Sequence, residues 1–191
     1  MHKNILSFIL LVGTIYALFT LFSGGQFPVS DNDISVAEEW MSAATDRQWA
    51  ASFQRSEAEE LRRLAQGLRK KEYLYDLDRK SNMNRAGEME FKAGELELLA
   101  FQNYEKAVEN ANNAAREYRK TKEKEKERQA FLMADQSKSR AIEALEKAAE
   151  SYESSAEAYG PDNADDNVKA GVSAEKASYC RELLARKKAG G

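Results

Sequence analysis

The chain has 191 residues, of which 42% are hydrophobic and 32% are charged, so its length suits one domain with an appendage. The 29 basic and 32 acidic residues give a net charge of −3. This balance argues against general nucleic-acid binding, which needs excess Lys and Arg to neutralise phosphates. The only His is His2 and the only Cys is Cys180. That inventory argues against a Ser-His-Asp triad, a His-ligated metal and an internal disulfide framework. We therefore expect no catalytic activity, no cofactor, no metal site and no small-molecule substrate.

The first hydrophobic segment, Ile5 to Phe22, contains no charged residue. As a helix it would rise about 27 Å, close to the ~30 Å hydrocarbon core of a bilayer. We expect a transmembrane helix over residues 5–23, after a leader of residues 1–4 and before a linker of residues 24–32. The segment is longer than the hydrophobic region of most signal peptides, which favours a retained signal anchor. Cleavage after Gly25 is the alternative.

The flanking charges and small residues of this segment predict its orientation and its neighbours. Lys3 precedes it, and no Lys or Arg follows until Arg47, so the positive-inside rule places the N-terminus in the cytoplasm. The rest of the chain would then lie in the periplasm or outside the cell. Small residues on one face would let another transmembrane helix approach closely. These are Gly13, Ala17, Thr20 and Gly24.

The region after the linker predicts an all-α, extended antiparallel bundle of three to four long helices over residues 33–188. No proline stands between Pro28 and Pro161, and strong helix formers dominate this stretch. The first helix should begin behind Asp33 and end at Ser81–Asn84. The apolar residues that this helix would carry are Ile34, Trp40, Met41, Ala44, Ala51, Phe53, Leu61, Leu64 and Leu68.

The clearest helical periodicity runs from Met89 to Tyr118, with a mean spacing of about 3.6 residues. One face of a helix has this spacing, so the stretch should lie at the centre of the domain. The predicted core residues are Met89, Ala93, Leu96, Ala100, Tyr104, Ala107, Ala111 and Ala114.

Two further helices are expected. One carries an apolar series from Ala141 to Tyr159 and should end at Gly160–Pro161, a helix stop signal. The last should begin near Ala164 behind Asp162 or Asn163 as the cap. The apolar residues that this last helix would carry are Val168, Val172, Ala177, Leu183 and Leu184.

The segment Arg116–Arg128 holds seven basic and four acidic residues and lacks an apolar stripe. It should be a solvated helix that projects from the bundle or forms a helical corner, with a basic patch for acidic lipid headgroups or a partner as the alternative. No Gly or Pro fixes the turn that follows within residues 119–139. Asp135–Ser137 is the best capping signal there.

Part of the C-terminal third resembles the edge of a tetratricopeptide repeat. Ala149, Ala156 and Pro161 have the spacing of that family's small residues and closing proline, and Ala170–Gly171 stands where a Leu-Gly pair would. The resemblance implies a helical-hairpin scaffold for protein contacts. It departs from the family at the large aromatic positions, which are Glu153, Asn167 and Ala174 here.

Several single residues have alternative interpretations. The acidic cluster Asp162, Asp165 and Asp166 fits helix capping better than Ca²⁺ binding, because the required loop pattern is absent. Cys180 should be a small packed residue, with an intermolecular disulfide as the alternative. Trp40 and Trp49 would contact the membrane interface, a partner or the core.

The sequence favours a membrane-anchored, non-catalytic structural or accessory subunit of a larger membrane protein complex. Its expected partners are the lipid bilayer and other membrane protein subunits, or copies of itself. The alternative is a tethered adaptor or self-assembling helical scaffold, either TPR-like or coiled-coil-like. An enzyme that uses only carboxylates is the third hypothesis, for which no specific pair of residues stands out.

Overall fold

The computed structural model describes residues 36–71, 76–159 and 164–189, and these residues form four helices and no strand. The helices are α2 (Val36–Arg69), α3 (Asp76–Thr121), α4 (Lys124–Ala158) and α5 (Ala164–Ala189). An all-α helical domain is therefore confirmed. None of these four helices has a stretch apolar enough to cross a bilayer. The expected transmembrane helix and linker lie outside the described residues.

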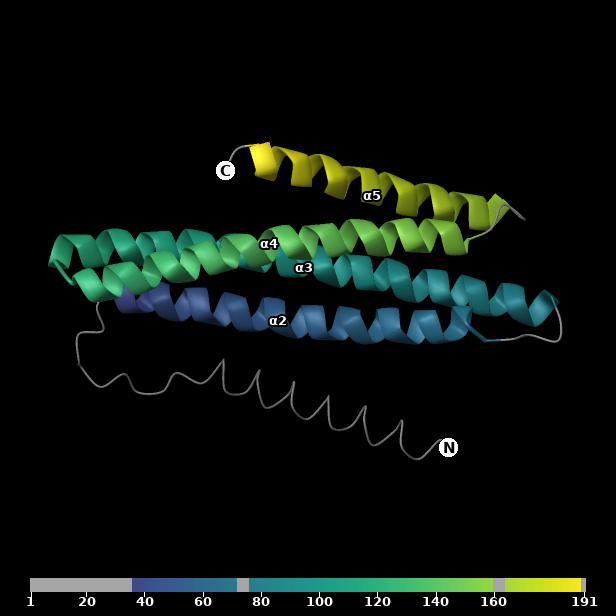
Figure 1. Cartoon of the computed structure of the whole chain (residues 1–191), viewed down its shortest axis with the longest axis horizontal. Helices are drawn as coiled ribbons and strands as arrows, with labels where there is room; N and C mark the ends of the chain where they lie inside the picture. Colours follow the sequence, from purple (N-terminus) through teal and green to yellow (C-terminus); the bar gives the residue numbers. More distant parts are fainter. Residues whose placement is uncertain (1–35, 72–75, 160–163, 190–191) are drawn as a thin grey trace, which may run out of the picture. The chain divides into compact units, whose positions relative to one another are not determined.

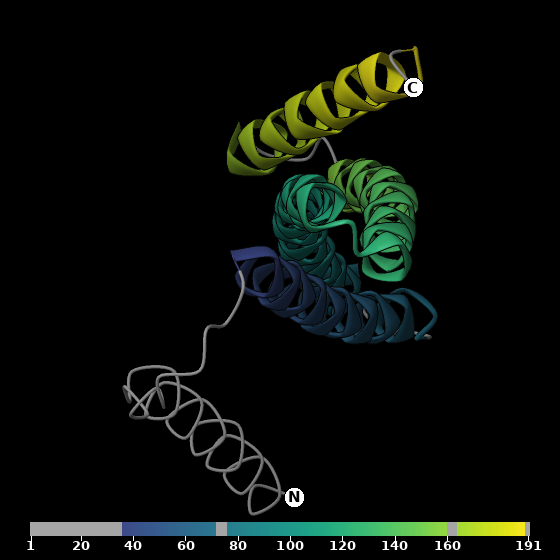
Figure 2. The same ribbon diagram turned by 90° about the vertical axis from the view of Figure 1, so that its left-hand side faces the viewer.

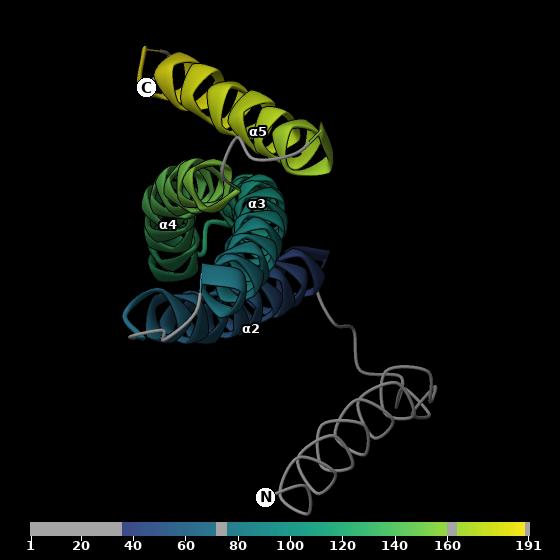
Figure 3. The ribbon, with the colours of Figure 1, turned by 90° about the vertical axis from the view of Figure 1, so that its right-hand side faces the viewer.

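The α3 and α4 helices form an antiparallel hairpin, and the other two helices pack on it (Figure 1). Figures 2 and 3 show α2 on one side of this pair and α5 on the other. Residue numbers increase together along the contacts between α2 and α4. Glu38 of α2 contacts Lys126 of α4, and further along Arg62 contacts Ser151, so these two helices run in the same direction. Consecutive helices are thus antiparallel, as the sequence predicts.

Alanine occupies every seventh position on the buried faces of α2 and α3. A strict seven-residue repeat keeps the same face of each helix turned to its partner along a left-handed supercoil. Small side chains at those positions let the two backbones approach closely. The buried alanines are Ala37, Ala44, Ala51, Ala58 and Ala65 on α2, and Ala86, Ala93, Ala100, Ala107 and Ala114 on α3.

Tyr152 of α4 and Tyr159, which directly follows α4, pack against two glycines of α3. The ring of Tyr152 lies over Gly94 and that of Tyr159 over Gly87. The two tyrosines are seven residues apart in the sequence, and so are the two glycines. A Cβ atom added at Gly94 would come within 2.8 Å of the Tyr152 ring. Phe91 meets the same ring edge-on, with centroids 5.4 Å apart. The glycines are therefore required by close approach and fix the α3–α4 register.

The helix ends agree with the prediction at one junction between helices and differ from it at the other two. The break between α4 and α5 surrounds Gly160–Pro161, as predicted. The predicted break at Ser81–Asn84 is wrong, because these residues lie inside α3, which begins at Asp76. Asn84 donates a hydrogen bond of 3.2 Å to Asp166 of α5, so a tertiary contact stabilises the helix where local propensity is weak.

The second difference is the turn between α3 and α4. Asp135–Ser137 lies inside α4, and the chain reverses at Lys122, whose φ of 64° is left-handed. The charged segment Arg116–Arg128 therefore forms a helical corner, one of the two expected arrangements. The expected caps Asp33, Asp162 and Asn163 lie outside the described residues.

Burial separates the predicted apolar residues into two groups. Of the predicted core of α3, Ala93, Ala100, Tyr104, Ala107, Ala111 and Ala114 are buried, whereas Met89 and Leu96 are partly exposed. Several apolar residues of the outer helices face solvent, because α2 and α5 are covered on one side only. These are Trp40, Phe53 and Leu64 on α2, and Val168 and Val172 on α5.

Candidate functional site

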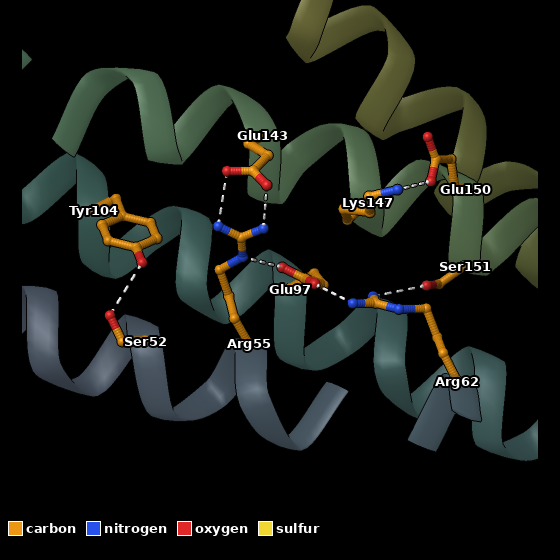
Figure 4. Close-up of polar contacts among 9 residues, drawn as sticks. All are labelled: Ser52, Arg55, Arg62, Glu97, Tyr104, Glu143, Lys147, Glu150 and Ser151. Carbon is orange, nitrogen blue, oxygen red and sulfur yellow. Dashed lines mark hydrogen bonds and ion pairs between the residues drawn. The ribbon is translucent and has the colours of Figure 1, made fainter. Parts of the chain in front are cut away.

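Arginines follow the alanine repeat of α2 at a second heptad position. Arg55, Arg62 and Arg69 are seven residues apart and project toward α3 and α4. Figure 4 shows the first two reaching across Glu97 of α3 to side chains of α4. The interface of α2 with α3 and α4 therefore contains charged side chains as well as alanines.

Glu97 is the centre of this charged group. Its carboxylate is fully buried and lies 3.2 Å from Nε of Arg55 and 2.8 Å from Nη2 of Arg62. Burial raises the pKa of Glu97, and the two guanidinium groups oppose that rise. Burial thus disfavours the charged form of this carboxylate, and the two cations of α2 favour it.

The two arginines are in turn held by α4. Arg55 pairs with Glu143 at 2.8 Å, and its hydrogen bond to that carboxylate raises the guanidinium pKa. Arg62 donates to the Ser151 hydroxyl at 3.4 Å. Two arginines and two glutamates balance in charge, so the group joins three helices without a net buried charge.

The same arrangement extends in both directions along the interface. Gln48 donates to the Ser137 hydroxyl at 2.7 Å, and Arg69 donates to the Ser154 carbonyl at 2.6 Å. Glu90, seven residues before Glu97, is also buried, and burial raises its pKa while Arg69 and Arg62 oppose the rise. We call the residues Gln48, Arg55, Arg62 and Arg69, with Glu90 and Glu97, the polar ladder.

The geometry of the polar ladder suits recognition between helices. Both oxygens of Glu97 face guanidinium groups and none of its side chain is exposed, so no substrate can reach it in this conformation. Buried ion pairs contribute little net stability, but losing one partner leaves a costly unpaired charge. The polar ladder therefore specifies which helices pair and in which register.

The α5 helix is held by polar contacts as well as by Ala177, Cys180 and Leu184, which belong to the hydrophobic core. The Ser155 hydroxyl donates 2.8 Å to the Gly87 carbonyl and lies 3.1 Å from the Ser173 hydroxyl. Lys176 lies over the rings of Phe91 and Tyr152, at 4.4 Å and 5.4 Å from their centroids. The expected alternative to capping at Asp166 was Ca²⁺, but this residue is buried against Asn84. Among the described residues no group of acidic, His or Cys side chains could hold a metal ion.

Cys180 and the tryptophans have different environments. The Cys180 thiol is fully buried, which agrees with a packed residue and leaves it inaccessible to a second thiol. Trp40 is 37% exposed and Trp49 is 75% exposed, so neither belongs to the buried core. With Phe53, which is 64% exposed, Trp49 forms an aromatic pair on the outer face of α2.

The sequence did not single out the polar ladder. The seven-residue spacing of Arg55, Arg62 and Arg69, matched by Glu90 and Glu97, was the available signal. The predicted transmembrane packing residues Gly13, Ala17, Thr20 and Gly24 lie outside the described residues.

No protein-family model, curated protein or solved structure matches this chain. The resemblance to a tetratricopeptide repeat therefore gains no support. The helix lengths also contradict it, because α4 alone spans 35 residues and a repeat of about 34 residues contains two helices.

Proposed function

We propose that the chain is a membrane-anchored, non-catalytic structural or accessory subunit of a larger membrane protein complex. In this proposal residues 5–23 form the transmembrane anchor, with Gly13 and Ala17 on its packing face. The helical domain lies outside the cytoplasm and makes protein–protein contacts. No cofactor is required.

The exposed pair Trp49 and Phe53 carries this proposal. Large aromatic side chains are enriched at the energetic centres of protein interfaces, where they fill pockets on the partner. Both residues lie on α2, the helix closest along the chain to the proposed anchor, so a neighbour in the same membrane could reach them. Meanwhile the buried charges of the domain are engaged in helix pairing, which favours a scaffold.

Purification of the full chain from its own membranes in mild detergent tests this proposal. The wild type should co-purify with partner subunits, and the double variant Trp49→Ser, Phe53→Ser should lose them while staying folded. Leu99→Ser removes an apolar side chain of α3 that is 45% exposed, and serves as the matched control. A chain that migrates as a lone monomer, without partners after crosslinking, would contradict the proposal.

A tethered, self-assembling helical scaffold is the second candidate. It is favoured by a stripe of exposed apolar residues on the outer face of α5, formed by Val168, Val172 and Tyr179. If the only co-purifying species is another copy of the chain, this candidate replaces the accessory subunit.

A further inference from the structure

The α5 helix lies on the α3–α4 hairpin, on the side opposite α2 (Figure 2), and two rows of ion pairs border it. In both rows α5 supplies the cation and the hairpin supplies the carboxylate. One further pair, Lys80 of α3 with Asp166 of α5 at 3.9 Å, has the opposite sense. We call the two rows the ionic rows. They consist of Lys169–Glu88, Lys176–Glu95 and Lys187–Glu105 along α3, and of Arg181–Glu153 and Lys188–Glu146 along α4.

The lysines along α3 also lie over aromatic rings. Nζ of Lys169 is 5.4 Å from the centroid of the Tyr159 ring, and Nζ of Lys187 is 5.8 Å from that of Phe101. Lys176, between them, lies over two rings. Each lysine thus makes a cation–π contact in addition to its ion pair, and both contacts depend on its positive charge. The position of α5 is therefore controlled by charge at three points along its length.

The apolar contact beneath α5 is small. The buried apolar residues of the helix are Ala177, Cys180 and Leu184, whereas Asp166 and Ser173 are its buried polar ones. The backbone of α5 comes close to that of α4, and the helix reaches α3 mainly through long side chains. The alanine faces and the polar ladder, in contrast, join α2, α3 and α4 without a residue of α5. Loss of α5 would therefore leave the interfaces among the other three helices in place.

Solvent exposure separates the two kinds of charge in the domain. The side chains of the ionic rows are 33% to 59% exposed, whereas the Glu97 side chain in the polar ladder is fully buried. Dissolved salt screens exposed charges strongly, with a Debye length of about 3 Å at 1 M, and screens buried ones much less. Salt should therefore weaken the attachment of α5 far more than that of α2.

We infer that α5 is a strap that detaches from the hairpin as a unit while α2, α3 and α4 stay folded, and that the ionic rows set how readily it detaches. Elements with few buried apolar contacts open locally at a lower free-energy cost than the whole domain. Detachment would uncover Phe91, Tyr152 and Cys180 together with the glutamates of the ionic rows. The inference goes beyond the proposed function, because it concerns a motion within the domain and holds for any partner.

Cys180 reports on this motion, because its thiol is fully buried beneath α5. The full chain in mild detergent is labelled with a thiol reagent at salt concentrations from about 0.05 M to about 1 M NaCl. Each rate is divided by that of the urea-unfolded chain at the same salt concentration, which removes effects on the thiol itself. Labelling should speed at least about fivefold over this range, whereas the amide hydrogen exchange of α2 should stay slow.

Charge reversal at the two ends of α5 tests the ionic rows directly. Lys169→Glu with Lys188→Glu places carboxylates opposite Glu88 and Glu146, so labelling at low salt should speed at least about fivefold. Adding Glu88→Lys and Glu146→Lys to the same chain restores opposite charges and should slow labelling again. All four positions are at least eight residues from Cys180 in the sequence, so its immediate neighbours stay unchanged.

A matched control makes the same change of charge away from α5. Lys70 of the α2 end and Lys124 of α4 are exposed, and Lys70→Glu with Lys124→Glu should label like the wild type. Labelling that ignores both salt and charge reversal would overturn the inference. So would amides of α2 that exchange as fast as those of α5, because Cys180 would then be reached only by complete unfolding. Release of partner subunits is not measured, so the proposed function stands or falls separately.

Discussion

The contact between Gly94 and Tyr152 makes a sharp prediction about packing. Replacing a helical glycine by alanine ordinarily stabilises a helix by about 1 kcal/mol. At Gly94 the added Cβ atom would lie 2.8 Å from a fully buried ring, and Phe91 contacts that ring as well. Overpacking of this kind costs about 1–3 kcal/mol. Gly94→Ala should therefore destabilise the chain by up to about 2 kcal/mol, against the helix propensity.

Gly171 provides the matched control. It lies inside α5, and a Cβ atom there meets no atom within 4 Å. Gly171→Ala should therefore stabilise the chain by up to about 1 kcal/mol. The two alanine variants should differ by about 1–3 kcal/mol in the free energy of unfolding, measured by urea denaturation monitored by circular dichroism.

A second substitution tests the cause. In the Gly94→Ala background, Tyr152→Leu removes the ring that the methyl group meets, so the double variant should lose less stability than the two single losses predict. Gly94→Ala with the same stabilising effect as Gly171→Ala would refute the argument, because the tyrosine would then have room to move.

Three further predictions concern buried polar groups. Arg62→Met should lower the free energy of unfolding by about 2–4 kcal/mol, because Glu97 keeps only one cation, and adding Glu97→Gln should recover part of the loss in the same urea titration. Burial raises the pKa of Glu97 above its ordinary value of 4.5, so the stability that this carboxyl contributes when protonated is lost as the pH rises through the raised pKa. Glu97→Gln should flatten that decline above pH 4.5, and an unchanged profile would show that Glu97 is not its source. Burial also raises the pKa of the Cys180 thiol to about 11. A thiol reagent at pH 8 should therefore label the native chain at least about 100-fold more slowly than the unfolded chain. Leu184→Ala should speed this labelling by loosening α5.

The alanine face of α3 was the part of the fold that the sequence predicted best. Residues such as Ala93, Ala100 and Ala107 recur with helical spacing, and so small a side chain contributes to a core only where helices approach closely. The pattern therefore carries information about packing as well as about helicity. Gly160–Pro161 was equally informative, because both residues end a helix for local reasons that no distant contact overrides.

The partners of each helix face could not be predicted from periodicity. Trp40 and Phe53 have the spacing of inward residues, but α2 is covered by the hairpin on one side only. Glu97 lies in a sequence rich in exposed glutamates, and its burial depends on two arginines more than thirty residues earlier in the chain. These properties arise from the arrangement of the helices, which the sequence alone did not determine.

The polar ladder explains how a repetitive interface reaches one structure. If α2 slid by seven residues along α3, alanines would still face alanines, so the repeat alone permits several registers of similar packing. In one direction the slide would put Gln48 in the place of Arg55 and leave Glu97 with one arginine. In the other direction it would move Arg69 into the place of Arg62, and Glu90 would lose one of the two arginines that oppose the effect of its burial. An unpaired buried charge costs several kcal/mol, more than the alanine contacts could compensate, because each alanine buries little apolar surface. One register therefore persists, and with it the fixed positions of Trp49 and Phe53 on the outer face of α2.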